Sequence, residues 1–225
     1  EARDAAGGSA GVLRVRAPRV GATAAADVGT EIAVDALAAN LDGVRRIEVE
    51  GFKVYGSTAN TTVNSTLIGR IESDNAAFAG IGGERSDAIL ARLTANDASL
   101  ADRTSVRAGV ELRSTGNITM SSAWNLSTFD DNGSLARPGG QPVNLTVRAQ
   151  RDLTVSASLS DGLRNSNGPA SAIAPEAAIV GTGADLRLVG GADLSAADPL
   201  AVIASADDIA PAGNLTIGRS NTDVI

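Results

Sequence analysis

The side chains in this sequence that could do chemistry are carboxylates, because histidine and cysteine are both absent. The densest acidic stretch, Asp130-Asp131-Asn132-Gly133, resembles the start of a calcium-binding loop. An EF-hand loop needs oxygen ligands at alternate positions and a closing glutamate, and this stretch has neither. A second pair, Asp207-Asp208, could bind a cation weakly, but a solvated turn is the favoured interpretation. Both stretches are therefore interpreted as polar turns, and no metal site is predicted.

Composition excludes several further classes of site. Without histidine or cysteine there are no usual zinc, haem or iron–sulfur ligand sets, no cysteine nucleophile, no Ser-His-Asp triad and no disulfide. The formal net charge is −7 and only five side chains are aromatic, which is the wrong composition for binding nucleic acid. No run of 18 apolar residues exists, so no membrane span is predicted. We predict no catalytic residues, no cofactor and no enzymatic activity.

An enzyme acting on polysaccharide is kept as a less favoured alternative. Repetitive β-proteins of that kind line one outer face with acids, lysines and arginines. Here Lys53 is the single lysine, and the acids are scattered along the chain. Trp124 and Phe129 could form a platform for a sugar ring, although covering the end of a strand or the base of a loop is the simpler role.

Six asparagines lie in Asn-x-Ser/Thr sequons that glycosylation could use in the right compartment. Three of them recur with a repeated strand pattern, which favours a role in turns and strand pairing over modification. The six are Asn60, Asn64, Asn117, Asn125, Asn144 and Asn214.

The elements that must position these residues are short strands, because the dominant hydrophobic period is two. Leu13, Val15 and Ala17 alternate with arginines, and similar alternation covers 110–114, 143–149 and 153–159. Such a pattern is typical of strands with one buried and one solvated face. It predicts that Leu145, Val147, Leu153 and Val155 are buried. Their alternating neighbours are expected to be exposed, namely Thr146, Arg148 and Thr154.

A short motif precedes several of these strands: a Gly, Arg or Ala, then Asn or Asp, then Leu or Ile, then Thr or Ser. Asn and Asp favour a corner before a strand because they tolerate left-handed backbone. The recurrence predicts an all-β fold, a right-handed parallel β-helix or solenoid, in preference to a β-sandwich. The copies begin at Gly116, Arg151, Ala192 and Gly213, with a near copy at Gly183.

The sandwich alternative depends on tight hairpins. Its turn signals are Asn132-Gly133, Asp161-Gly162 and Asn167-Gly168. These dipeptides lie in longer Gly/Ser/Asn-rich stretches instead of two-residue turns, so they favour the sandwich only weakly.

One stretch breaks the period of two, and it divides the chain. Between residues 57 and 96 the apolar spacing becomes helical, beginning with Val63, Leu67, Ile68 and Ile71. We predict two short helices there, with Ser86 as the N-cap of the second and Asn96 as its end. The predicted organisation is β-helix coils over 1–56, a helical or loop excursion over 57–96, and β-helix coils over 97–225.

Two smaller expectations concern the strands and the chain ends. Gly51 is expected to form a bulge or corner, because Ile47 and Val49 before it and Phe52 and Val54 after it are out of phase. The chain starts without an initiator Met and stops within an apolar pattern, so we expect a fragment cut at both ends.

The ordered series of motifs over 100–165 resembles the repeat region of filamentous-haemagglutinin-like exoproteins of two-partner secretion systems. The segment 201–225 is similar at its close, and 40–55 more weakly. The residues that carry the resemblance are Val110-Glu-Leu-Arg-Ser-Thr-Gly-Asn-Ile-Thr119, Trp124-Asn-Leu-Ser127, Gly139-Gly-Gln-Pro142, Leu145-Thr-Val-Arg-Ala149, Asp152-Leu-Thr-Val155 and Ser158-Leu-Ser-Asp-Gly162.

The resemblance implies a secreted protein on the bacterial outer surface, carried past a dedicated outer-membrane β-barrel transporter. It implies adhesion or cell contact by the whole molecule, through a host or neighbouring-cell receptor or glycan that stays unknown. This chain would be a structural shaft segment that packs against neighbouring coils of the same long protein. The alternative is the shaft of a contact-dependent growth inhibition toxin, which shares such repeats. The lack of cysteine agrees with transport of an unfolded chain.

Overall fold

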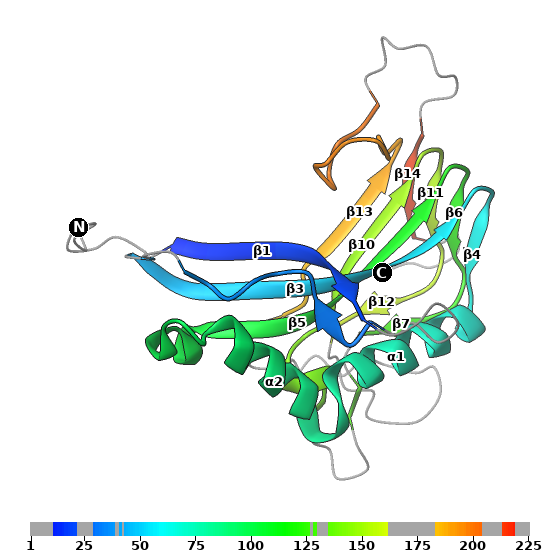
Figure 1. The fold of residues 1–225 in the computed structure, drawn as a ribbon. Coiled ribbons are helices and arrows are strands. Elements are labelled where there is room, and N and C mark those ends of the chain that lie inside the picture. Colours follow the sequence, from blue (N-terminus) through cyan, green and yellow to red (C-terminus); the bar gives the residue numbers. More distant parts are fainter. Residues whose placement is uncertain are drawn as a thin grey trace, which may run out of the picture. The chain divides into compact units, whose positions relative to one another are not determined.

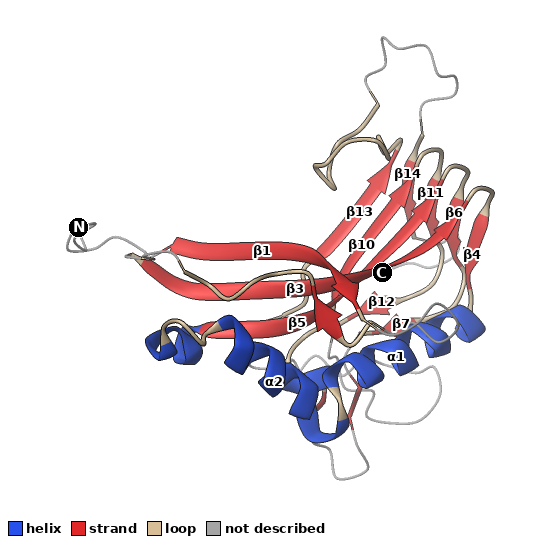
Figure 2. Cartoon of the chain, viewed as in Figure 1, coloured by secondary structure: helices blue, strands red, loops and turns tan. Residues whose placement is uncertain are grey.

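The structure is a computed structural model (Figures 1 and 2). Helices make up 23% and strands 42% of the residues it describes. Two compact units divide the chain. Unit 1 takes its residues from Glu1–Lys53, Ser73–Gly109 and Pro138–Gln141, and unit 2 from Val54–Glu72, Val110–Arg137 and Pro142–Ile225. The described residues are 11–21, 29–38, 41, 43–126, 128–129, 135–161, 183–203 and 213–218.

The predicted all-β, right-handed parallel β-helix is wrong. The fold is mixed α/β, and it contains antiparallel as well as parallel strand pairs. The period of two was a sound indicator of strands, but it says nothing about what closes their apolar face. A helix can bury an apolar row as well as another strand does, and Phe78 lies against Gly51 in this way.

Unit 1 contains a sheet with the strand order β5-β3-β1-β2. Strand β1 (Gly11–Val20) runs parallel to β3 (Val44–Ser57), and β2 (Glu31–Ile32) pairs antiparallel with β1. Its remaining elements are the first part of β5 (Thr104–Ser114), the end of α1 (Ser65–Ala79), α2 (Glu84–Leu93) and the 3-10 helices η1 (Ile81–Gly83), η2 (Ala98–Arg103) and η3 (Pro138–Gly140).

Both α-helices lie between residues 57 and 96, but their ends differ from the predicted ones. Helix α1 begins after Asn64, whose Oδ1 accepts a hydrogen bond from the Leu67 amide at 3.0 Å, and Val63 belongs to a strand. Helix α2 begins at Glu84, and Ser86 is a buried residue within it instead of its N-cap. The preceding Gly83 has φ 91°, a left-handed conformation that suits glycine and turns the chain into the helix one turn earlier.

Gly51 forms neither a bulge nor a corner, because β3 pairs with β1 in unbroken register on both sides of it. A Cβ at Gly51 would lie 2.7 Å from Ile32 Cγ1 and 3.0 Å from Phe78 Cζ, so the glycine lets α1 pack closely on the strand. Phe52 and Val54 therefore stay on the opposite, partly exposed face of β3.

That opposite face of unit 1 carries buried charge. The Glu48 carboxylate is 3.1 Å from Arg14 Nε, 2.8 Å from Arg46 Nε and 3.1 Å from Arg107 Nη2. The side chains of Glu48 and Arg107 are only 3% and 2% exposed. A buried charge is costly without a partner, so the glutamate on β3 requires arginines on the neighbouring strands.

Unit 2 contains two ladders of strands. One has the order β13-β10-β5-β3, and the other has the order β14-β11-β6-β4 (Figure 1). Shorter pairs are formed by β7 with β12, in parallel, and β8 with β9, antiparallel. The strand bounds are β4 Thr61–Val63, β6 Ile118–Met120, β7 Trp124–Asn125, β8 Thr128–Phe129, β9 Leu135–Ala136, β10 Asn144–Ala149, β11 Leu153–Val155, β12 Leu159–Ser160, β13 Leu186–Gly190 and β14 Leu215–Ile217.

Strands β4, β6, β11 and β14 are called the rungs. They are parallel and in register, so that Leu153 of β11 faces Ile118 of β6 on one side and Leu215 of β14 on the other. A threonine occupies the middle position of every rung. Apolar side chains thus stack in columns from rung to rung, as the alternating pattern predicts.

The predicted buried row is confirmed, and the predicted exposed row is largely wrong. Exposed fractions are 0% for Leu145, Val147 and Leu153 and 5% for Val155. Thr154 is intermediate, but Thr146 and Arg148 are 0% and 2% exposed. Their face is covered, because Arg187 reaches Thr146 Oγ1 at 3.5 Å and Arg148 Nη2 donates to the Asp193 carbonyl after β13.

A side-chain relay joins the rungs at the corner before each strand. The backbone amide of Asn117 donates to Asn60 Oδ1 at 2.9 Å, and that of Asp152 donates to Asn117 Oδ1 at 3.1 Å. The amide of Asn214 donates in turn to Asp152 Oδ1 at 2.9 Å. Each Asn or Asp therefore satisfies the first free amide of the next rung, which is why this residue type recurs there. These four residues and their three bonds are called the Asx relay.

The relay also explains why glycine precedes two of its members. A Cβ at Gly116 would lie 2.4 Å from Asn60 Oδ1. At Gly213 it would lie 2.2 Å from the Arg151 carbonyl oxygen. The corners of successive rungs approach too closely for any side chain at these two positions.

The rungs predict a sharp contrast between two neighbouring substitutions. Val155→Asp places an unpaired charge among buried apolar columns and should cost several kcal/mol. Thr154→Asp, on the partly solvated face, should cost far less. Because each rung contacts only its neighbours, limited proteolysis of Val155→Asp should cut first near residues 140–160. Equal protease resistance of the two variants would contradict the assigned faces.

Candidate functional site

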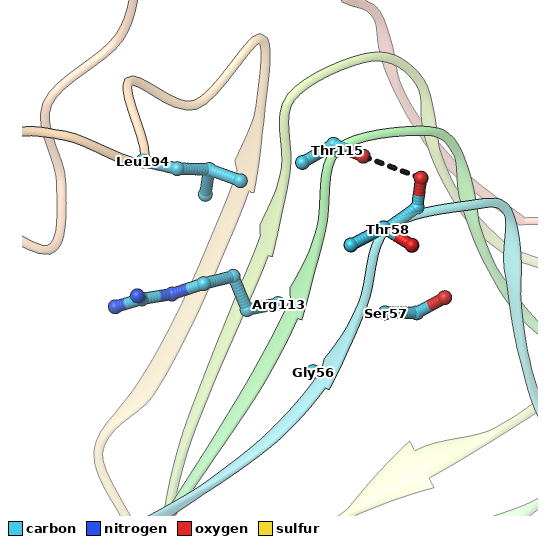
Figure 3. Close-up of a pocket in the computed structure, with 6 residues that line it drawn as sticks. All are labelled: Gly56, Ser57, Thr58, Arg113, Thr115 and Leu194. Carbon is cyan, nitrogen blue, oxygen red and sulfur yellow. Dashed lines mark hydrogen bonds between the residues drawn. The ribbon is translucent and has the colours of Figure 1, made fainter.

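Unit 2 contains a hollow with a volume of about 540 Å³ (Figure 3). It lies where β3 and β5 end, beside the segment that follows β13. Figure 3 shows Arg113 and Leu194 on the side away from Ser57 and Thr58. Its size falls within the roughly 300–1,000 Å³ of small-molecule sites. The lining residues are Gly56, Ser57, Thr58, Arg113, Thr115 and Leu194.

The charge at the hollow comes from a cluster of two arginines and one glutamate. Glu111 Oε1 accepts hydrogen bonds from Arg113 Nε at 3.0 Å and Nη2 at 2.6 Å, and lies 3.3 Å from Arg148 Nη1. Glu111 and Arg148 are buried, whereas the Arg113 side chain is 37% exposed. The buried Arg148 Nε has no hydrogen-bond partner among the described residues. Arg113 is the exposed end of this cluster.

The segment that holds Leu194 is fixed to this cluster. The Asp193 carbonyl accepts the hydrogen bond from Arg148, and Asp193 Oδ1 accepts bonds from the Ser195 amide and hydroxyl at 2.9 and 2.6 Å. The bonds from Ser195, with a smaller contribution from the charge of Arg148, lower the pKa of Asp193. Asp193 is therefore a carboxylate at neutral pH, exposed to solvent beside the hollow.

Hydroxyl groups line the opposite side and retain hydrogen-bonding capacity. Ser57 lines it through its backbone, because its side chain points away from Arg113 and Leu194 (Figure 3) and its Oγ accepts a bond from the Ala59 amide at 3.1 Å. Thr115 Oγ1 donates to the Thr58 carbonyl at 2.8 Å, so its lone pairs are available to accept. The Thr58 hydroxyl makes no hydrogen bond to any described part of the chain. A ligand here meets donors and an acceptor in a small space.

The candidate residues named from the sequence lie elsewhere. Trp124 is buried, at 3% exposure, and it cannot offer a ring face to a sugar. Lys53 pairs with Asp74 at 3.0 Å. The side chain of Phe129 and the acidic stretches 130–133 and 207–208 lie outside the described residues.

The sequon asparagines expected to act in turns and pairing do so. Asn117 and Asn214 belong to the Asx relay, and Asn144 is 2% exposed and accepts a bond from the Asp185 amide at 3.1 Å. The structural role expected for these three residues is confirmed. Asn60 joins the same relay, and Asn64 caps α1.

Sequence reasoning did not single out the hollow. The alternation at 110–114 predicts that Arg113 lies on the outer face of its strand. Nothing local indicates that Leu194 folds back beside it, because Ala192-Asp193-Leu194-Ser195 carries the strand motif and yet forms turns and bends. Among the residues that the structure describes, no three His, Cys, Asp or Glu side chains gather as a metal site would need. Nor is any helix in that part of the chain long and apolar enough to cross a membrane.

Comparisons with protein-family models, with curated proteins and with solved structures found no match.

Trp124 takes part in a testable electrostatic feature. Partial burial raises the pKa of the Glu72 carboxyl in α1. The hydrogen bond that Trp124 donates to this carboxyl lowers its pKa by less. The net result is a pKa above the ordinary 4.5. The folded state thus holds this proton more tightly than the unfolded chain. The contribution of Glu72 to folding stability is therefore greatest below pH 4.5, the unfolded pKa. It is lost as the pH rises from 4.5 through the higher pKa of the folded state.

Glu72→Gln cannot ionise, so it avoids the loss of stability at higher pH, and its side-chain oxygen still accepts the hydrogen bond from Trp124. The variant should gain stability relative to the parent at neutral pH and show little difference at about pH 4, where Glu72 is largely protonated. Urea unfolding midpoints across this range measure the effect. Glu84→Gln, at the exposed start of α2, is the control. A variant whose advantage is independent of pH would contradict the raised pKa.

Proposed function

We propose that this chain is a structural segment of a secreted bacterial surface exoprotein, with no catalytic role, which extends an adhesin and presents its contact regions. The proposal rests first on the Asx relay. Three successive corners use an Asn or Asp side chain to accept the same bond, with distances of 2.9, 3.1 and 2.9 Å. Such a relay is a means of adding strands one after another, which is what an extended presenting segment requires.

The last rung supports the same proposal. Backbone bonds repeat along the ladder: the Ile118 amide donates to the Asp152 carbonyl and the Leu153 amide donates to the Asn214 carbonyl. By this pattern the Leu215 amide and Asn214 Oδ1 are directed at the place of a following strand. Leu215 is 45% exposed, whereas the matching Leu153 is fully buried. A further parallel strand of the same pattern would satisfy both the polar groups and the apolar column.

The charged side chains support a structural role as well. Glu48 binds three arginines and Glu111 binds two. Carboxylates held in this way are already neutralised by fixed partners, so they are poorly placed to exchange protons with a substrate. The contact-dependent toxin shaft has no separate observation in its favour, since its segment would have the same construction.

Secretion tests the proposal. The chain is fused behind the transporter-recognition domain of a two-partner secretion exoprotein and is produced together with that protein's outer-membrane transporter. The fusion should reach the surface of intact cells, where added protease digests it. Retention of the fusion in the periplasm would contradict the proposal.

The control for this experiment blocks unfolding. Thr119 and Thr154 are direct neighbours in register on β6 and β11. Thr119→Cys combined with Thr154→Cys should form a disulfide in the oxidising periplasm and halt transport until a reductant is added. A single cysteine at either position should be exported like the parent.

A further inference from the structure

We infer that the hollow beside Arg113 binds a sugar acid, a pyranose ring that carries one carboxylate and several hydroxyl groups. This inference goes beyond the structural role proposed above and does not rest on it, since a presenting segment needs no ligand of its own.

The charge of the hollow selects a carboxylate. Arg113 uses Nε and Nη2 to bind Glu111, and its Nη1 makes no hydrogen bond to the part of the chain that the structure describes. Glu111 also lies against the fully buried Arg148, so one carboxylate is shared by two guanidinium groups. The Arg113 side chain is 37% exposed, and a planar guanidinium is well suited to bind a carboxylate.

The hydroxyl groups and Leu194 select a sugar ring over a simple acid. Thr58 offers a hydroxyl group and Thr115 offers an acceptor, which matches the mixed donors and acceptors of ring hydroxyls. Leu194 adds an apolar wall against which the C–H groups of a pyranose can pack (Figure 3). A small inorganic anion or acetate would use Arg113 and leave the other groups without partners.

Gly56 keeps the space for the ring open. A Cβ built at this position meets only Val54 Cγ1, at 3.8 Å, so a side chain here would point into open space and cause no clash. Gly56→Leu is therefore a clean way to fill the hollow, because it leaves the charge cluster intact. Asp193, the exposed carboxylate beside the hollow, opposes an acidic ligand and limits its affinity.

The test is a titration of the labelled chain with D-glucuronate, followed by amide NMR. Shifts should saturate at residues 56–58, 113, 115 and 194, with a dissociation constant of about 1 mM. Acetate lacks the sugar ring and methyl β-glucoside lacks the carboxylate. Each should bind about tenfold more weakly than glucuronate or not at all. Acetate binding as tightly as glucuronate would overturn the sugar-acid assignment, and so would equal binding of the uncharged glucoside.

Four variants locate the binding. Arg113→Gln should weaken glucuronate binding at least about tenfold, and Gly56→Leu should abolish it while the spectrum stays well dispersed. Asp193→Asn should tighten it about two- to threefold by removing repulsion. Arg151→Gln makes the same charge change at an exposed arginine that does not line the hollow, and it should have no effect. Unchanged binding in Gly56→Leu, or the absence of saturable shifts in the parent chain, would overturn the inference.

Discussion

The constraint on which unit 2 depends is the parallel, in-register stacking of its rungs, fixed by the Asx relay. A strand of three residues cannot hold its own register, because it makes too few backbone bonds. The relay adds one side-chain bond at each corner, and that bond forms only when the next Asn or Asp arrives in step. Register then aligns Ile118, Leu153 and Leu215 in one apolar column. Glycine at positions 116 and 213 is needed because the aligned corners leave no space for a side chain.

The same alignment accounts for the use of charge in this protein. Side chains on the polar face of neighbouring strands are held side by side, so a glutamate buried there must be surrounded by arginines. Glu48 in unit 1 and Glu111 in unit 2 are both satisfied in this way. These two buried carboxylates are therefore engaged in holding strands together. Arg113 differs because β5 ends just after it, and its partly exposed guanidinium lines the hollow there.

Sequence reasoning was reliable where the physics is local. Alternation fixed which side of β10 and β11 is apolar, and Val147 and Leu153 are fully buried as predicted. It failed where a face is covered by a distant segment: Arg148 was expected to be exposed, but the chain around Asp193 covers it. The all-β prediction failed for the same reason, because a period of two does not show whether a helix or a strand closes the apolar side. The hollow depends on one such long-range approach and could not be read from any motif.

The most direct test of this account is hydrogen exchange at the relay amides. In the parent chain, the amide of Asp152 should exchange about as slowly as that of Leu153 beside it, because both are hydrogen-bonded between rungs. In Asn117→Ala the Asp152 amide loses its acceptor and should exchange at least about tenfold faster, whereas the Leu153 amide keeps its bond to the Asn214 carbonyl and stays protected. An Asp152 amide that exchanges at the same rate with and without the Asn117 side chain would contradict the central role of the relay.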